Sequence, residues 1–108
     1  MMPNSNVFEG YSDHFDAEVR LIILKALQDE PGKALTDSFI ISPVFAEFSI
    51  RRDRDYLRTQ LKWMETQAGA VRLTQAGTAI IVHLTERGAN HLSRISEVSG
   101  IKAPSLPR

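Results

Sequence analysis

The apolar residues of this 108-residue chain change their spacing at Gly69. Before Gly69 they recur every three or four residues, which predicts amphipathic helices; after it they alternate, which predicts β-strands. Helical spacing returns after Thr85. Such a chain is expected to fold into packed helices, a β-hairpin and a further helix, and its length suits a single domain.

The part of the chain before residue 50 predicts an arm and two helices. Residues 1–11 are polar and show no apolar period, so they are predicted to be a flexible arm. A first helix is predicted to begin at Asp13 and to end before Pro31. Residues 35–48 predict a second helix, in which Pro43 requires either a kink or a restart.

The clearest helix covers residues 54–68, with Asp53 as its cap and Gly69 ending it in the left-handed conformation. Its apolar side carries Leu57, Leu61 and Met64. The opposite side is basic and polar. Tyr56 and Trp63 lie on the flank between the two sides, where packing against the core is the expected role.

After Gly69 two strands are predicted around a turn at residues 75–77, and a last helix, capped by Thr85, is predicted over residues 86–98. Residues 100–108 contain two prolines and two basic residues and are predicted to be an extended tail. The domain is therefore expected over residues 12–99. It is mainly α with a β-hairpin, in the order helix-helix-helix-strand-strand-helix.

This order resembles that of the winged helix-turn-helix domains, in which the hairpin is called the wing. The string LRTQLKWMETQAGAVRL resembles their third helix and first wing strand, and HLTERGANHL is similar to their passage from the wing to the next helix. A closer resemblance, over about residues 18–108, is to small winged-helix proteins of Mu-like transposable prophages. The residues that carry it are RLIILKALQDEPG, LRTQLKWME, LTERG and GIKAPSLPR.

The resemblance implies a transcriptional regulator that binds double-stranded DNA with its third helix in the major groove, as a homodimer in the cytoplasm. The groups that suit contacts with base edges are Asp55, Arg58, Thr59 and Lys62. The groups that suit contacts with phosphates are Arg51, Arg52 and Arg54, and Arg72 is the cation of the first wing strand. Replacing Arg58 and Lys62 by alanine is expected to weaken DNA binding without changing the melting temperature.

The charge of residues 51–62 supports DNA binding, whereas the charge of the whole chain does not. Residues 51–62 hold five basic and two acidic side chains, whereas the whole chain has no net charge and the predicted wing turn has no Lys or Arg. The alternating Arg and Asp residues can instead form ion pairs with one another. The alternative function is a non-enzymatic protein-interaction or oligomerisation module on the same scaffold.

Apolar residues outside the main stripes suggest a dimer interface. Leu21, Leu24 and Ile81 are the candidates, and ordinary burial within the chain is the alternative. No enzymatic motif is present. The three histidines lack the spacing of a zinc site, cysteine is absent, and neither a phosphate loop nor a nucleophile elbow occurs. No cofactor, metal, small-molecule ligand or membrane span is therefore expected.

Overall fold

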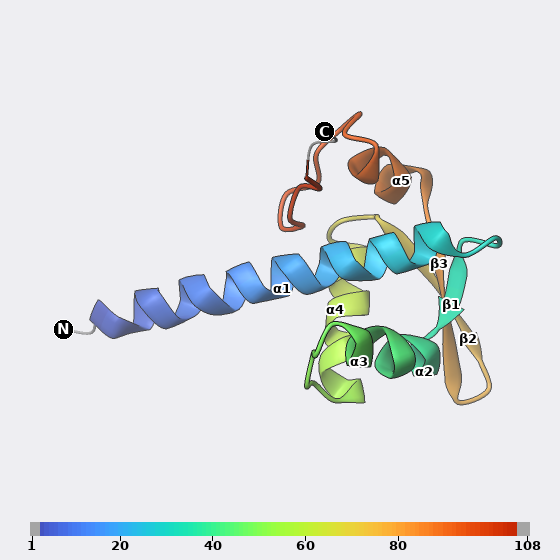
Figure 1. Cartoon of the computed structure of the whole chain (residues 1–108), viewed down its shortest axis with the longest axis horizontal. Coiled ribbons are helices and arrows are strands. Elements are labelled where there is room, and N and C mark those ends of the chain that lie inside the picture. Colours follow the sequence, from blue (N-terminus) through green and yellow to red (C-terminus); the bar gives the residue numbers. More distant parts are fainter. Residues whose placement is uncertain (1–2, 106–108) are drawn as a thin grey trace.

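A computed structural model describes the backbone of residues 3–105 and the side chains from Ser12 to Ser105 (Figure 1). In these residues, four helical segments accompany a small three-stranded antiparallel sheet, one of the four being a broken segment made of α2, η1 and α3. The elements are α1 (Pro3–Asp29), β1 (Ala34–Thr36), α2 (Asp37–Phe39), η1 (Ile40–Val44), α3 (Phe45–Glu47), α4 (Arg54–Thr66), β2 (Val71–Ala76), β3 (Ala79–Leu84) and α5 (Glu86–Leu92).

Helix α1 is longer than the sequence pattern predicted. It begins at Pro3, so most of the stretch assigned to a flexible arm is helical backbone, and Asp13 is not its cap. Its predicted end before Pro31 is confirmed. The N-terminal half extends beyond the rest of the molecule, while the C-terminal half crosses the centre of the fold (Figure 1).

The dimer interface predicted at Leu21 and Leu24 is wrong, because these side chains are only 6% and 0% exposed in the single chain. The C-terminal half of α1 packs against helices and strands on several sides, including α4, α5 and β3. A helix with a single neighbour buries one apolar stripe. Because α1 has neighbours on several sides, it also buries apolar residues outside that stripe.

The second helical segment is broken, as Pro43 predicted. Ser42 has extended backbone angles, φ −155° and ψ 115°, and the chain turns helical again through Val44 into α3. The segment starts later than predicted because Leu35 and Thr36 belong to strand β1. Thr36 then caps α2, since its hydroxyl accepts a hydrogen bond from the Phe39 amide at 3.2 Å.

The sheet has the order β1-β3-β2, with both pairings antiparallel. The predicted hairpin is confirmed as β2–β3, and its turn lies at Gly77 and Thr78, where Gly77 has a φ of +64°. Strand β1 was not predicted. It has only three residues, too few to show an alternating pattern, and it exists because β3 offers a free edge.

Helix α4 agrees closely with the prediction. The Asp53 carboxylate accepts a hydrogen bond from the Tyr56 amide at 2.9 Å, and Gly69 follows the helix with a φ of +66°. Its core-facing residues are Leu57, Gln60, Leu61 and Met64, all 3% exposed or less. The apolar side of this helix therefore anchors it in the centre of the molecule.

Helix α5 is shorter than predicted. Thr85 caps it as expected, but the helix ends at Leu92, and Ile95, which lies within the predicted helix, is 73% exposed. The tail that follows is irregular and held in place. Ile101 is buried, and the Lys102 amide donates a hydrogen bond to the Ala17 carbonyl of α1 at 3.1 Å.

Candidate nucleic-acid interface

The outer face of α4 carries the polar side of the amphipathic helix, as the sequence predicted. Asp55, Thr59 and Lys62 are exposed and succeed one another at spacings of four and three residues, so they form one stripe. The Thr59 hydroxyl donates a hydrogen bond to the Asp55 carbonyl at 3.0 Å. Lys62, at the C-terminal end of this stripe, is exposed to solvent.

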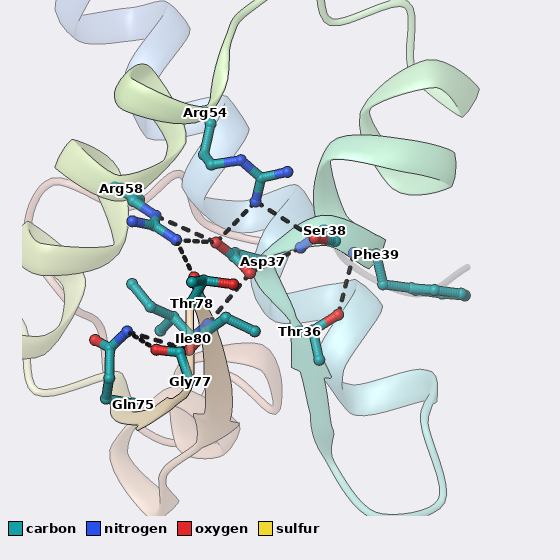
Figure 2. A network of polar contacts seen from close by, with 11 residues as sticks. Thr36, Asp37, Ser38, Phe39, Arg54, Arg58, Gln75, Gly77, Thr78 and Ile80 are labelled. Atoms are coloured by element: carbon teal, nitrogen blue, oxygen red, sulfur yellow. Dashed lines mark hydrogen bonds and ion pairs between the residues drawn. The ribbon is translucent and has the colours of Figure 1, made fainter.

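Two of the predicted DNA-binding arginines are bound to a carboxylate instead. Asp37, the first residue of α2, is completely buried, and its Oδ2 accepts hydrogen bonds from Arg54 Nη1 at 2.9 Å and from Arg58 Nη2 at 2.8 Å and Nε at 3.2 Å (Figure 2). Its Oδ1 accepts from the backbone amides of Ser38 at 2.9 Å and Ile80 at 3.2 Å. One buried acid thus joins α2, α4 and β3.

The electrostatics of this network favour an ionised Asp37. Burial alone would raise the pKa of this carboxyl, but the hydrogen bonds from Arg58, the Ile80 amide and Arg54 together hold the pKa below its usual value. The two arginine side chains remain 45% and 37% exposed. Two guanidinium groups on one carboxylate leave a net positive charge at the surface, although neither arginine is unpaired.

Arg58 also fixes the hairpin relative to α4. Its Nη2 donates a hydrogen bond to the Thr78 carbonyl in the β2–β3 turn at 2.9 Å (Figure 2). Within the turn, the Gln75 side-chain amide donates to the Gly77 carbonyl at 2.9 Å. The side chain predicted to read bases therefore has a structural role, and replacing it would disturb the fold. The structure thus predicts a lower melting temperature for an Arg58 variant, in place of the unchanged one expected from the sequence.

The arginines before α4 differ in their surroundings. Arg52 lies over two aromatic rings, with its guanidinium carbon 4.7 Å from the Phe15 centroid and 5.3 Å from the Tyr56 centroid. The Tyr56 hydroxyl donates a hydrogen bond to Asp16 at 2.5 Å, and burial together with this bond raises the pKa of the phenol. Arg51 is exposed and has no ion pair among the described side chains.

Trp63 packs within the molecule, as the sequence analysis expected. The Arg20 guanidinium carbon lies 3.8 Å from its ring centroid, and Gly100 lies against the other part of the ring. A Cβ on Gly100 would approach the indole to 2.5 Å, so only glycine fits there. These contacts give the half-buried Trp63 a packing role within the molecule.

Arg72 lies apart from the α4 cations. It is exposed on the outer face of β2, and its Nη1 is 3.4 Å from the Thr74 hydroxyl. The β2–β3 turn itself, Gly77 and Thr78, has no cationic side chain. Ile81 of β3, the third predicted dimer residue, is half-buried, and nothing in the single chain tests its role between subunits.

The histidines do not gather into a metal site in the described part of the chain. Between Ser12 and Ser105, no group of three or more metal-ligating side chains comes together. His91 is buried and has a structural role: its Nδ1 accepts a hydrogen bond from the Val98 amide at 3.0 Å, and its Nε2 lies 2.9 Å from the Lys102 carbonyl. It thereby ties the tail to α5.

Asp37 is the residue that the sequence analysis missed. Thr36 before it and Ser38 after it are residues typical of a helix start. That local signal can identify a cap. It cannot show that the carboxylate meets arginines 17 and 21 residues later in the chain.

None of the helices in the described residues has both the length and the apolar character needed to cross a membrane. Comparison with protein-family models, with curated proteins and with solved structures produced no match to this chain.

Proposed function

We propose that this protein binds double-stranded DNA as a winged-helix domain, with α4 in the major groove and the β2–β3 hairpin as the wing. The observation that carries the proposal is the exposed stripe of Asp55, Thr59 and Lys62 on α4, beside a hairpin held to the same helix by Arg58. A rigid helix with one side in the core and one polar side in solvent is the element that enters a major groove.

The residues have different roles in this proposal. Lys62 and Thr59 face base edges, where Lys donates to guanine acceptors and Thr contacts either a base or a methyl group. Arg51 and Arg52, before the start of α4, contact phosphates, as Arg72 on the wing strand does. Arg54 and Arg58 hold α4 against α2 and the wing, and they add the residual positive charge of their shared pair with Asp37.

The affinity is expected to be modest and dependent on salt. The chain has no net charge, so long-range attraction to DNA is weak, and binding depends on the local cations. Each phosphate that a cation neutralises adds about 0.9 to the slope of log affinity against log salt. By its resemblance to prophage proteins, the domain would regulate transcription in a bacterial cytoplasm, as a dimer whose contacts lie outside Leu21 and Leu24.

Fluorescence anisotropy with a labelled random duplex at two salt concentrations tests the proposal. The key variant is Arg51→Ala/Lys62→Ala, because both side chains are exposed and neither takes part in an ion pair in the described structure. The matched control is Lys25→Ala/Arg87→Ala, which removes two exposed cations from α1 and α5. The key variant should lose about tenfold in affinity and lower the salt slope, whereas the control should bind as the unchanged protein does.

Melting temperatures of all proteins should agree within a few degrees, which excludes unfolding as the cause. Equal losses in the key and control variants would mean that binding is a non-specific charge effect. Absence of binding by the unchanged protein at low salt would refute the proposal and favour the protein-interaction module.

A further inference from the structure

Two large aromatic side chains are exposed on the side of the molecule formed by the broken helical segment. Phe39 ends α2 and is 44% exposed, and Phe48 follows α3 and is 51% exposed. Phe39 points away from the Asp37 network (Figure 2). Large apolar side chains that gather on a surface usually mark a binding site, so we expect this pair to contact a binding partner.

The two phenylalanines border a groove between the C-terminal end of α1 and the segment α2–η1–α3. Its lining is Ala26, Asp29, Glu30, Leu35, Phe39, Pro43, Val44, Glu47 and Phe48. A second hollow continues it along the open edge of β1 and shares Glu30, Leu35 and Phe39 with the first. Ile81, half-buried on β3, lines that continuation. The groove thus has an apolar floor and lies between two helical walls.

The walls of the groove are acidic. Asp29 and Glu30 lie at the end of α1, and Glu47 lies on α3; none of them forms an ion pair with the described side chains. The negative end of the α1 dipole adds to this charge. Two cations lie near the walls: Lys33, whose ammonium group donates to the Gln28 carbonyl at 2.7 Å, and Lys25, one turn before Asp29 on α1. Neither forms an ion pair with the three carboxylates, and three carboxylates against two cations leave a negative excess.

We propose that this groove, here called the Phe39–Phe48 groove, binds a basic amphipathic helix of a partner protein. An apolar face of such a helix would cover the two phenylalanines, and lysines or arginines on both of its borders would meet the carboxylates of the two walls. The groove shares no residue with the α4 stripe. The inference therefore goes beyond DNA binding and does not depend on it.

The probe is a fluorescein-labelled peptide of about twelve residues whose helix has a leucine face bordered by lysines. Two control peptides replace all lysines with glutamates or all leucines with serines. The proposal predicts saturable binding of the first peptide and at least about tenfold weaker binding of both controls, because apolar burial and charge complementarity each contribute. Equal binding of the serine control would mean charge attraction alone and would overturn the proposal.

Variants locate the site. Phe39→Ser/Phe48→Ser should weaken peptide binding about tenfold or more. Ile95→Ser, which removes an even more exposed apolar side chain elsewhere, should leave peptide binding unchanged. Glu30→Gln/Glu47→Gln keeps the apolar floor and should weaken binding and reduce its salt dependence. Circular dichroism checks whether the phenylalanine variant folds. If it does not, the glutamine variant still tests the site.

Molar mass by light scattering tests whether a second copy of this chain, and not a helix of a partner protein, occupies the groove. If the unchanged protein is a dimer and Phe39→Ser/Phe48→Ser is a monomer, a second copy of the chain covers the groove and the proposal is wrong. Absence of peptide binding by the unchanged protein would also overturn it. Loss of duplex DNA binding in Arg51→Ala/Lys62→Ala is a separate result and leaves this inference unaffected.

Discussion

Replacing Asp37 by asparagine should destabilise the protein by about 2–3 kcal/mol. Asparagine keeps one oxygen for the Ser38 and Ile80 amides, but it presents an amide NH2 where two guanidinium groups need an acceptor. A hydrogen bond to a charged group contributes about 1.5–3 kcal/mol. Because the two arginines are 45% and 37% exposed, water regains part of their solvation, and the lower end of that range applies to each.

Urea and thermal unfolding, followed by circular dichroism, measure this loss. At about 4–8 °C per kcal/mol for a domain of this size, the melting temperature should fall by roughly 8–24 °C. The control is Glu97→Gln, which neutralises an exposed carboxylate without an ion pair in the described structure and should change stability by less than about 0.5 kcal/mol.

The same carboxylate gives a pH signature. Burial raises the pKa of Asp37, but hydrogen bonds from Arg58, the Ile80 amide and Arg54 outweigh it, so the folded-state pKa lies below the unfolded value of about 3.9. The stabilisation is therefore complete above that value and is lost as pH falls through the folded-state pKa. The difference in the free energy of unfolding between the unchanged protein and Asp37→Asn should therefore become smaller below about pH 4. Two results would refute the reasoning: a loss in the free energy of unfolding of under about 0.5 kcal/mol at pH 7, or a difference between the two proteins that does not vary with pH.

Three further outcomes are expected from the packing. Gly88→Ala should lower stability by about 2 kcal/mol in urea unfolding, since the new Cβ would lie 2.4 Å from the Ala70 carbonyl oxygen; an unchanged midpoint would contradict this. His91→Phe should release the tail, detected as faster hydrogen exchange of the backbone amides after residue 97, while α4 remains protected. Burial and the bond to Asp16 raise the pKa of the Tyr56 phenol, so its stabilising effect persists at neutral pH and is lost as pH rises above about 10. Spectrophotometric titration should therefore show Tyr56 ionising only together with alkaline unfolding, and a Tyr56→Phe protein should lack that phase.

The elements that the sequence predicted well are those set by neighbouring residues. Asp53 and Thr85 cap helices through backbone amides three positions away, and Gly69 supplies the left-handed residue after α4. Pro43 cannot continue a regular helix, so the break beside it follows from its ring. The α4 faces and the hairpin likewise follow from the spacing of apolar residues along a short stretch of chain.

Contacts between distant segments decided the rest. β1 is a strand because β3 pairs with it, and Leu24 is buried because several elements enclose α1. Arg58 belongs to a stripe of cations in the sequence, yet the fold brings Asp37 from 21 positions away to bind it. Spacing along a helix determines which side a residue occupies, whereas only packing determines what stands opposite that side. For that reason the sequence alone identified the polar face of α4, and the tertiary structure decided which of its cations remain free.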